Sequence, residues 1–431
     1  MKASLLLAVI FAIAICLKTS AQIKASFPER IVHQFQGHFN NDKPDSVFSM
    51  LSPNTQRILS PSRLQSVFTQ IRSQFGNLDS TRMLSSKDSM AYFKASFAKA
   101  PLLLTISLDV NQKIGIFTFT PYSEPARKSS NAHFEEVDIS FTRPDLTLKG
   151  TLALPKSGIH ETLIIIVAGS GPTDRNGNQN GAANNSLQMA SAGLAEKGFA
   201  TVRYDKRGVG ESQKAGITEK DLRFDDYAKD LASITRDLMD DKRFKRIVLL
   251  GHSEGALLAM IVARELKPAG LIILNGQAEP ADVLLRRQLR KNLPDSTFQI
   301  ANTILAGLKA GKITDNISNT TLSGVFRPNV QPYLISWMVY DPTQIIKQVS
   351  VPTLIVQGLT DLQTGEDQAK KLAEALPSCK LVLIDDMNHV LKKSSINTIE
   401  NLQTYNNPDL RLNEKLLPPI ISFIDRIKQQ P

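Results

Sequence analysis

The 431-residue sequence contains only two cysteines, Cys16 and Cys379, and a single tryptophan. Cys16 lies in a predicted leader segment, so the mature chain is expected to keep one thiol and no intrachain disulfide. A domain of this size can be stable through its hydrophobic core alone. The sequence also lacks a His-x-x-x-His pattern and any cysteine pair with metal-ligand spacing. We therefore expect neither a disulfide framework nor a metal or other cofactor.

The chain has no concentrated block of basic residues, although its formal net charge is +10. Lysine and arginine residues are spread along the whole length and read as a solvated surface. Nucleic-acid recognition favours a basic stripe or interleaved aromatic residues, and neither is present. We expect no nucleic-acid partner.

Long apolar runs are also missing, since the apolar segment of residues 5–16 is too short to span a membrane. A short, positively charged N-terminal region precedes this apolar segment, and small residues before Gln22 form a plausible cleavage site. The pattern predicts a secretory signal peptide over residues 1–21. The protein is then exported, periplasmic or secreted, with no stable membrane insertion after cleavage. Two alternatives stay open, an uncleaved anchor and lipidation of Cys16.

Two changes in the spacing of apolar residues divide the rest of the chain. Residues 28–75 carry apolar side chains at helical spacing, and residues 78–122 carry strand patterns. These features predict a small α+β domain over residues 27–122. The polar, turn-rich residues 123–131 read as a linker.

Residues 132–431 alternate between short apolar strands and helical segments. This alternation predicts an α/β fold with a doubly wound, mainly parallel sheet. A helix over residues 413–427 is expected to close the chain. Residues 279–350 are far longer than one crossover helix requires. We interpret them as an inserted helical lid over the carboxyl ends of the strands, where such sheets bind ligands.

The pentapeptide at residues 251–255 reads Gly-His-Ser-Glu-Gly and separates a strand pattern from a run of helix formers. Such a strand-to-helix turn exposes the Ser253 hydroxyl at the edge of the sheet. Gly251 and Gly255 let the neighbouring elements approach without Cβ clashes. Ser253 is thus the candidate nucleophile.

A serine nucleophile requires a general base and an orienting acid. His389 is the only histidine beyond Ser253, and it follows the last predicted strand. The side chain of His252 is not expected to act as the base, because adjacent residues on a tight turn point apart. Asp361 follows an apolar strand and a glycine turn, which makes it the candidate acid.

The order Ser253, Asp361, His389 resembles that of the α/β-hydrolase superfamily, over about residues 132–431. Within the superfamily the chain is most similar to exported esterases and serine-aminopeptidase-like (S33-type) hydrolases. Residues 204–212 resemble the family's Asp-x-Arg-Gly-x-Gly-x-Ser turn, which braces loops around the nucleophile. The first domain resembles, by pattern only, the NTF2-like domain of unknown function that often precedes secreted hydrolases.

The resemblance also implies an oxyanion hole. The loop after the strand at residues 163–167 has Ala168-Gly169 where the commoner pattern has His-Gly. The resemblance implies that the backbone amides of Ser170 and Glu254 hold the oxyanion. Gly171 is the alternative donor on the loop.

These features predict a serine hydrolase that cleaves small-molecule carboxylic esters through an acyl-enzyme. A peptidase or amidase is the alternative, with Arg286, Arg287 and Arg290 of the lid available to clamp a peptide end. A non-catalytic binding protein on the same scaffold is disfavoured, because such proteins usually lose one of the three catalytic residues and all three are present.

Overall fold

In the computed structural model the chain forms two compact units, with the boundary between Tyr122 and Ser123. The predicted signal peptide and residues 123–129 of the predicted linker lie outside the described residues. No helix in the described part of the chain is long and apolar enough to cross a membrane. The described residues are 27–429 without 88–89, 123–129, 159–160, 180–181, 213–217, 316 and 318–319.

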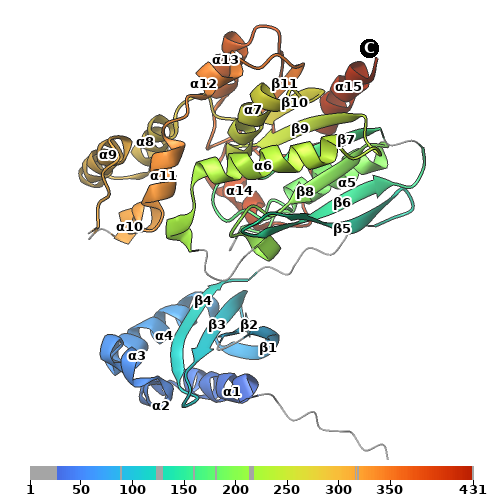
Figure 1. Ribbon diagram of the computed structural model, residues 1–431. Helices are drawn as coiled ribbons and strands as arrows, with labels where there is room; N and C mark the ends of the chain where they lie inside the picture. Colours follow the sequence, from blue (N-terminus) through green and yellow to red (C-terminus); the bar gives the residue numbers. More distant parts are fainter. Residues whose placement is uncertain are drawn as a thin grey trace, which may run out of the picture. The chain divides into compact units, whose positions relative to one another are not determined.

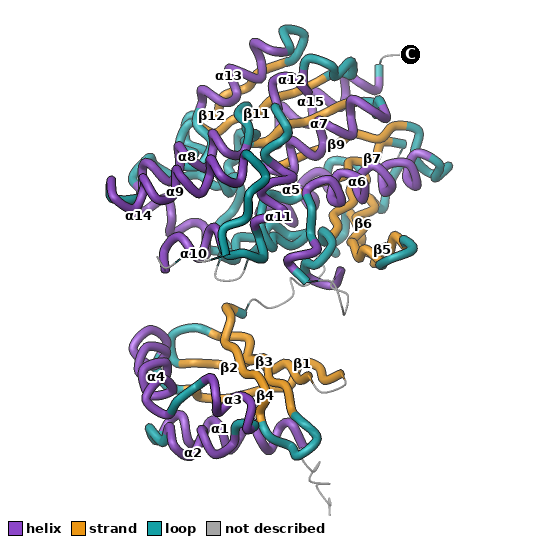
Figure 2. Tube along the Cα trace, turned by 60° about the vertical axis from the view of Figure 1, so that its left-hand side comes forward, coloured by secondary structure: helices purple, strands orange, loops and turns teal. Residues whose placement is uncertain are grey.

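The first unit packs helices beside an antiparallel sheet of order β1-β2-β3-β4 (Figure 2). Helix α4 begins where the Ser60 hydroxyl accepts the amide of Arg63, and it ends at Gly76 with a φ of 84°. Its described elements are α1 (Phe27–Asn40), α2 (Pro44–Met50), α3 (Pro53–Ile58), α4 (Pro61–Phe75), β1 (Leu78–Lys87), β2 (Met90–Phe97), β3 (Pro101–Leu108) and β4 (Ile114–Pro121).

Phenylalanine side chains form the centre of this unit. Phe39 is fully buried and packs edge-on against Phe68 and Phe97, with ring centroids 5.1 and 5.8 Å apart. Aromatic pairs of this geometry stabilise a core beyond the area they bury. The unit therefore has its own hydrophobic core, and we assign it no catalytic residue.

The second unit is built on a mixed sheet whose described strands follow the order β12-β11-β10-β9-β7-β8-β6-β5. Neighbours from β12 to β8 pair in parallel, and β6 and β5 extend the sheet antiparallel. The strands are β5 (Phe134–Thr142), β6 (Thr147–Pro155), β7 (Thr162–Val167), β8 (Ala200–Tyr204), β9 (Arg246–His252), β10 (Gly270–Leu274), β11 (Thr353–Gly358) and β12 (Lys380–Ile384).

Helices cover both faces of this sheet, and Figure 1 shows α6 and α7 on one face and α5 and α15 on the other. Alternate residues of a strand point to opposite faces, so Ile165 of β7 joins the first layer and Ile164 joins the second. The predicted doubly wound, mainly parallel α/β fold is confirmed. The helices outside the lid are α5 (Ser186–Glu196), α6 (Phe224–Met239), α7 (Glu254–Leu266), α13 (Glu366–Ala375), α14 (Thr398–Gln403) and α15 (Leu417–Lys428), with 3₁₀ turns η1 (Gly210–Ser212), η2 (Glu219–Asp221) and η3 (Thr404–Asn406).

The insertion between β10 and β11 is helical, as predicted, and α8 to α11 gather at one end of the unit (Figure 1). Trp337 of α11 is buried and stacks on Phe224 of α6, with ring centroids 6.1 Å apart. This contact ties the lid to the layer that covers the sheet. The lid helices are α8 (Ala281–Asn292), α9 (Asp295–Lys309), α10 (Thr320–Phe326), α11 (Gln331–Trp337) and α12 (Pro342–Ile346).

The closing helix begins at Leu417, four residues later than the pattern suggested. Pro418 and Pro419 lie in its first turn, the part of a helix where a missing amide hydrogen costs nothing. Asn413 instead bonds Asp386 through its side chain, with a distance of 2.9 Å between Nδ2 and Oδ1. The expected helix start was therefore wrong by about one turn.

We predict that Leu249→Ala lowers the free energy of unfolding of the second unit by about 2–5 kcal/mol, because Leu249 is fully buried in β9. The matched control Leu402→Ala, at a side chain that is 52% exposed, is expected to change it by less than about 0.5 kcal/mol. Urea unfolding followed by the fluorescence of Trp337, the sole tryptophan, reports on this unit alone. Equal effects of the two substitutions would contradict the assigned core.

Candidate active site

Ser253 lies between the end of β9 and the start of α7, at the carboxyl edge of the sheet. Its backbone has φ 55° and ψ −121°, a conformation that non-glycine residues rarely adopt. Strain of this kind costs on the order of 1–3 kcal/mol and persists only where the surrounding structure enforces it. The first turn of α7 directs its positive dipole end toward this position.

Two glycines make the turn sterically possible. A Cβ on Gly251 would lie 2.2 Å from the carbonyl oxygen of Gly255, and a Cβ on Gly255 would lie 2.4 Å from that of Val167. Real Cβ atoms do not approach oxygen so closely, so both positions require glycine. The loop after β7 also comes close, since a Cβ on Gly169 would lie 3.2 Å from the Ser253 Cβ.

Asp361 and His389 meet at the same edge, after β11 and β12 respectively. His389 Nδ1 lies 2.7 Å from Asp361 Oδ2, and both side chains are buried. Asp361 also accepts the backbone amides of Gln363 and Thr364 at 2.7 and 3.0 Å. Burial raises the pKa of Asp361, but the charge and hydrogen bond of His389 and these amides together hold that pKa below its ordinary value.

The structure brings Ser253 to this edge without a hydrogen bond to His389 among the described residues. All three predicted residues are therefore gathered at one edge, with a direct bond between Asp361 and His389 alone.

His252 does not point toward the position of the reacting atoms. Its Nε2 lies 2.7 Å from the backbone carbonyl oxygen of His389. A carbonyl only accepts, so this nitrogen carries the proton and donates. Burial and the nearby His389 lower the pKa of His252 to about 3. His252 is thus a neutral residue that holds the loop of His389, together with Asn275, whose Nδ2 donates to the same carbonyl at 3.2 Å.

The predicted oxyanion donors flank Ser253. Glu254 is the first residue of α7, where a backbone amide has no partner within the helix. Ser170 and Gly171 lie on the loop after β7, and Gly171 has a φ of 70°. The Ser170 carbonyl is held by the Thr173 hydroxyl at 2.6 Å and by Gln179 Nε2 at 2.9 Å.

The turn at residues 204–212 braces this loop. Asp205 accepts the amide of Arg175 at 2.8 Å and pairs with the Arg175 guanidinium at 2.7 Å. A Cβ on Gly210 would lie 2.3 Å from Asp205 Oδ2, so a side chain there would break the arrangement. Arg207, the arginine of the Asp-x-Arg-Gly-x-Gly-x-Ser pattern, pairs with Asp230 and Asp145 and does not face the reacting atoms.

Sequence reasoning missed a buried polar cluster beside the nucleophile, made by Lys206, the Glu254 side chain and Tyr333. Lys206 Nζ lies 3.2 Å from Glu254 Oε1, and the Tyr333 hydroxyl donates to Glu254 Oε2 at 2.5 Å. Only the position of Lys206 within the 204–212 motif offered a signal. A lysine in a loop is normally solvated, and nothing local indicates its burial.

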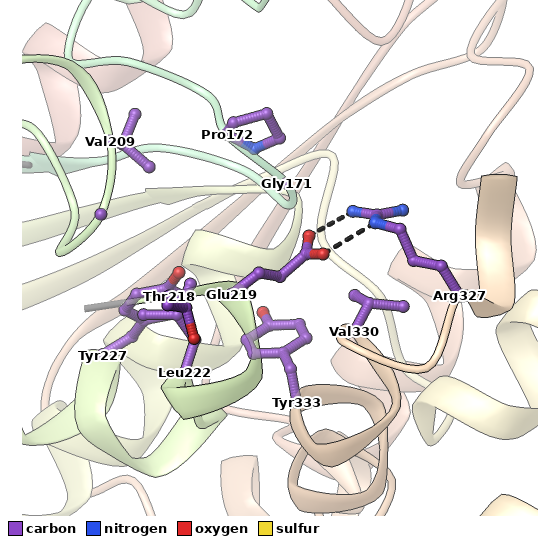
Figure 3. Close-up of a pocket in the computed structure, with 11 residues that line it drawn as sticks. Gly171, Pro172, Val209, Thr218, Glu219, Leu222, Tyr227, Arg327, Val330 and Tyr333 are labelled. Atoms are coloured by element: carbon purple, nitrogen blue, oxygen red, sulfur yellow. Dashed lines mark hydrogen bonds and ion pairs between the residues drawn. The ribbon is translucent and has the colours of Figure 1, made fainter. Parts of the chain in front are cut away.

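A cavity of about 220 Å³ opens beside the oxyanion loop. Figure 3 shows its lining, with Gly171 and Pro172 on one side and Tyr227 and Tyr333 on the other. Arg327 of the lid forms a bidentate ion pair with Glu219 of η2 at this cavity. The lining is mainly apolar, with the charges confined to this pair and satisfied within it.

The sheet, the strained serine turn and the buried Asp–His pair at one edge define an α/β hydrolase. Residues 182–393 match the family described as serine aminopeptidase, S33, and residues 32–117 match a family described as a protein of unknown function (DUF3887). The second unit has the α/β-hydrolase fold, and the protein is an enzyme similar to the esterases and serine hydrolases of that fold.

The chain is also similar to individual named proteins. The chain is 25% identical to esterase EstD of Thermotoga maritima over 375 residues, which cover 83% of this chain and 86% of that protein. It is 24% identical to a putative carbamate hydrolase, RutD, of Pseudomonas savastanoi over 200 residues, which cover 43% of this chain and 74% of the relative. A solved structure of Est1E from Butyrivibrio proteoclasticus with bound ferulic acid aligns with 18% identity and a TM-score of 0.46, covering 67% of this chain and 99% of that one.

We predict that His252→Gln reduces the acid sensitivity of the fold. Because the folded pKa of His252 is about 3 and its ordinary value is 6.5, the unfolded chain binds a proton that the folded chain does not. Its contribution to stability is complete above pH 6.5 and is lost as the pH falls toward 3. The loss amounts to about 2 kcal/mol between pH 7.5 and pH 5.

Urea unfolding at the two pH values, followed by Trp337 fluorescence, measures this difference. The wild type is expected to lose about 2 kcal/mol more than the variant on going to pH 5. Identical losses would contradict a buried, neutral His252.

Proposed function

We propose that the protein hydrolyses carboxylic esters, with Ser253 as nucleophile, His389 as general base and Asp361 as the group that orients His389. The observation that carries the proposal is the 2.7 Å bond between Asp361 and His389 at the edge that also holds the strained Ser253. A buried carboxylate that holds one imidazole nitrogen leaves the other free to take a proton.

In this mechanism His389 Nε2 removes the Ser253 proton as Oγ attacks the acyl carbonyl carbon. The amides of Ser170 and Glu254 hold the tetrahedral oxyanion, and each would supply about 3–4 kcal/mol. His389 then gives its proton to the departing alkoxide. A water, deprotonated by His389, cleaves the acyl-enzyme and releases the acid. Asp361 stabilises the imidazolium in both steps.

The relatives support an ester substrate, since a relative matched along most of its length is named an esterase. We further propose that the protein is exported, as the predicted signal peptide over residues 1–21 implies. Its substrate is then a small ester met outside the cytoplasm.

Amide hydrolysis is the second candidate, because the matched family is described as a serine aminopeptidase. Such an enzyme needs a free charged group for the peptide end. Of the three arginines considered for this role, Arg287 pairs with Glu279 and Asp367, and Arg290 pairs with Asp295. Arg286 has no ion pair among the described residues, so it is the arginine left for such a clamp and keeps amide hydrolysis as the second candidate.

We predict that Ser253→Ala abolishes hydrolysis of p-nitrophenyl acetate and leaves the circular dichroism unchanged. Asp361→Asn is expected to lower kcat by about 10³–10⁴-fold, because the imidazole loses its orienting acceptor. The control Ser191→Ala removes a buried hydroxyl of α5 that bonds Thr201, and it should retain turnover. Turnover in pure Ser253→Ala would refute the assignment.

We further propose that the acyl chain of the substrate enters the cavity beside the oxyanion loop, and we therefore predict a preference for short acyl chains. The cavity of about 220 Å³ is smaller than the roughly 300–1,000 Å³ of pockets that take drug-sized ligands. The kcat/KM for p-nitrophenyl acetate and butyrate should therefore exceed that for the decanoate. Val330→Phe, which narrows the lining, should lower the butyrate value more than the acetate value. Highest activity on the decanoate would contradict this use of the cavity.

A further inference from the structure

Lys206 is a buried cation that takes no part in the mechanism described above. It follows β8, and its side chain is 1% exposed. Its Nζ donates to the carbonyl oxygen of Gly169 at 2.5 Å and to Glu254 Oε1 at 3.2 Å. The ammonium also lies 5.0 Å from the centre of the Tyr227 ring. Burying a lysine is costly unless it is paired, so this arrangement calls for a reason.

We propose that Lys206 is a positioning residue for the oxyanion hole, holding the Gly169–Ser170 peptide so that the Ser170 amide faces the developing charge. The proposal rests on the ester hydrolysis proposed above. It assigns Lys206 no contact with substrate.

One peptide unit, that between Gly169 and Ser170, connects Lys206 to the Ser170 amide. In a trans peptide the carbonyl and the following N–H are coplanar and point in opposite directions. The bond from Lys206 to the Gly169 carbonyl therefore also sets the direction of the Ser170 N–H. Gly169 has no side chain to limit rotation of this peptide, and Gly171, two residues further along the loop, has a φ of 70°. A fixed external donor is what such a glycine-rich loop lacks by itself.

The same lysine also contacts the side chain of Glu254, the residue that carries the second proposed donor. Glu254 is fully buried, its side chain pairs with Lys206, and its backbone amide is the other proposed oxyanion donor. The single ammonium group of Lys206 thus bonds both to the peptide that carries the Ser170 amide and to the side chain of Glu254. A positive charge on the carbonyl side of a peptide also polarises its N–H, which strengthens that donor.

The lid takes part in this cluster. The Tyr333 hydroxyl of α11 donates to the remaining Glu254 oxygen. Burial and the adjacent Glu254 raise the pKa of Tyr333 well above its ordinary value, so the hydroxyl keeps its proton. Lid helix, nucleophile helix and oxyanion loop therefore share one satisfied polar network.

The test compares Lys206→Met with Arg207→Met. Both remove one cation and an ion pair from the same turn, but Arg207 pairs with Asp230 and Asp145 and does not contact Gly169. Lys206→Met leaves Glu254 unpaired, so the double variant Lys206→Met/Glu254→Gln is made beside it. For each, kcat and KM are measured with p-nitrophenyl acetate. The inhibition constant of phenylboronic acid, which forms a tetrahedral adduct on serine, is measured as well.

We expect Lys206→Met and the double variant to lower kcat and the affinity for the boronic acid by about 10–100-fold, with KM changed less than about threefold. Arg207→Met should change all three values by less than about threefold. Values close to wild type in both lysine variants would overturn the proposal. Equal losses in Arg207→Met, or failure of both lysine variants to fold, would also overturn it, because the ion pair would then be structural.

Ser253→Ala, measured in parallel, distinguishes a failure of the Lys206 proposal from a failure of the proposed ester hydrolysis on which it rests. Inactive Ser253→Ala together with fully active Lys206→Met leaves ester hydrolysis standing and refutes the role of Lys206. Active Ser253→Ala refutes both.

Discussion

The backbone of Ser253 is the constraint on which the site depends. A serine at φ 55° between a strand and a helix exists only because β9, α7 and the loop after β7 come within contact of one another. Gly251 and Gly255 permit this approach, and helix α7, which is buried over Glu254–Ala263, enforces it. The packing of the second unit's core stabilises the strained backbone of Ser253. The geometry of the site therefore depends on the packing of the core.

The charged side chains at the sheet edge that carries the site are paired with partners. Asp361 is held by His389 and by backbone amides, and Lys206 pairs with Glu254. His252 avoids charge altogether, since its pKa of about 3 keeps it neutral. A buried site with satisfied charges can hold fixed donors toward a developing oxyanion without reorganising solvent. In the neighbouring cavity the charged residues of the lining are likewise paired with each other, so the rest of the lining can contact apolar groups.

Much of the fold could be predicted from local patterns. Apolar runs such as residues 163–167 and 353–356 became parallel strands because a strand buried on both faces must be apolar throughout. The chain order of Ser253, Asp361 and His389 brought the three residues to one edge, since the carboxyl ends of parallel strands meet there. Short helices such as α10, α12 and α14 were missed, because five to seven residues carry too little periodicity.

The polar cluster beside the nucleophile could not be predicted for a different reason. The burial of Lys206 depends on a carbonyl 37 residues earlier and a carboxylate 48 residues later in the chain. No local sequence pattern indicates such contacts. By contrast, the fixed spacing of the glycines around Ser253 indicates the close backbone approach at that turn. Oxyanion donors are similar, since a backbone amide has no residue type of its own. Sequence therefore indicates the reacting side chains better than the backbone and the cation that serve them.

The proposed mechanism requires that Ser253 is the residue that becomes acylated. Labelling the protein with a fluorophosphonate and mapping its peptides by mass spectrometry tests this requirement. We expect one adduct per chain, on the peptide that contains Ser253, with ester hydrolysis lost in proportion to labelling. An adduct on another residue, or ester hydrolysis that persists after complete labelling of Ser253, would contradict it.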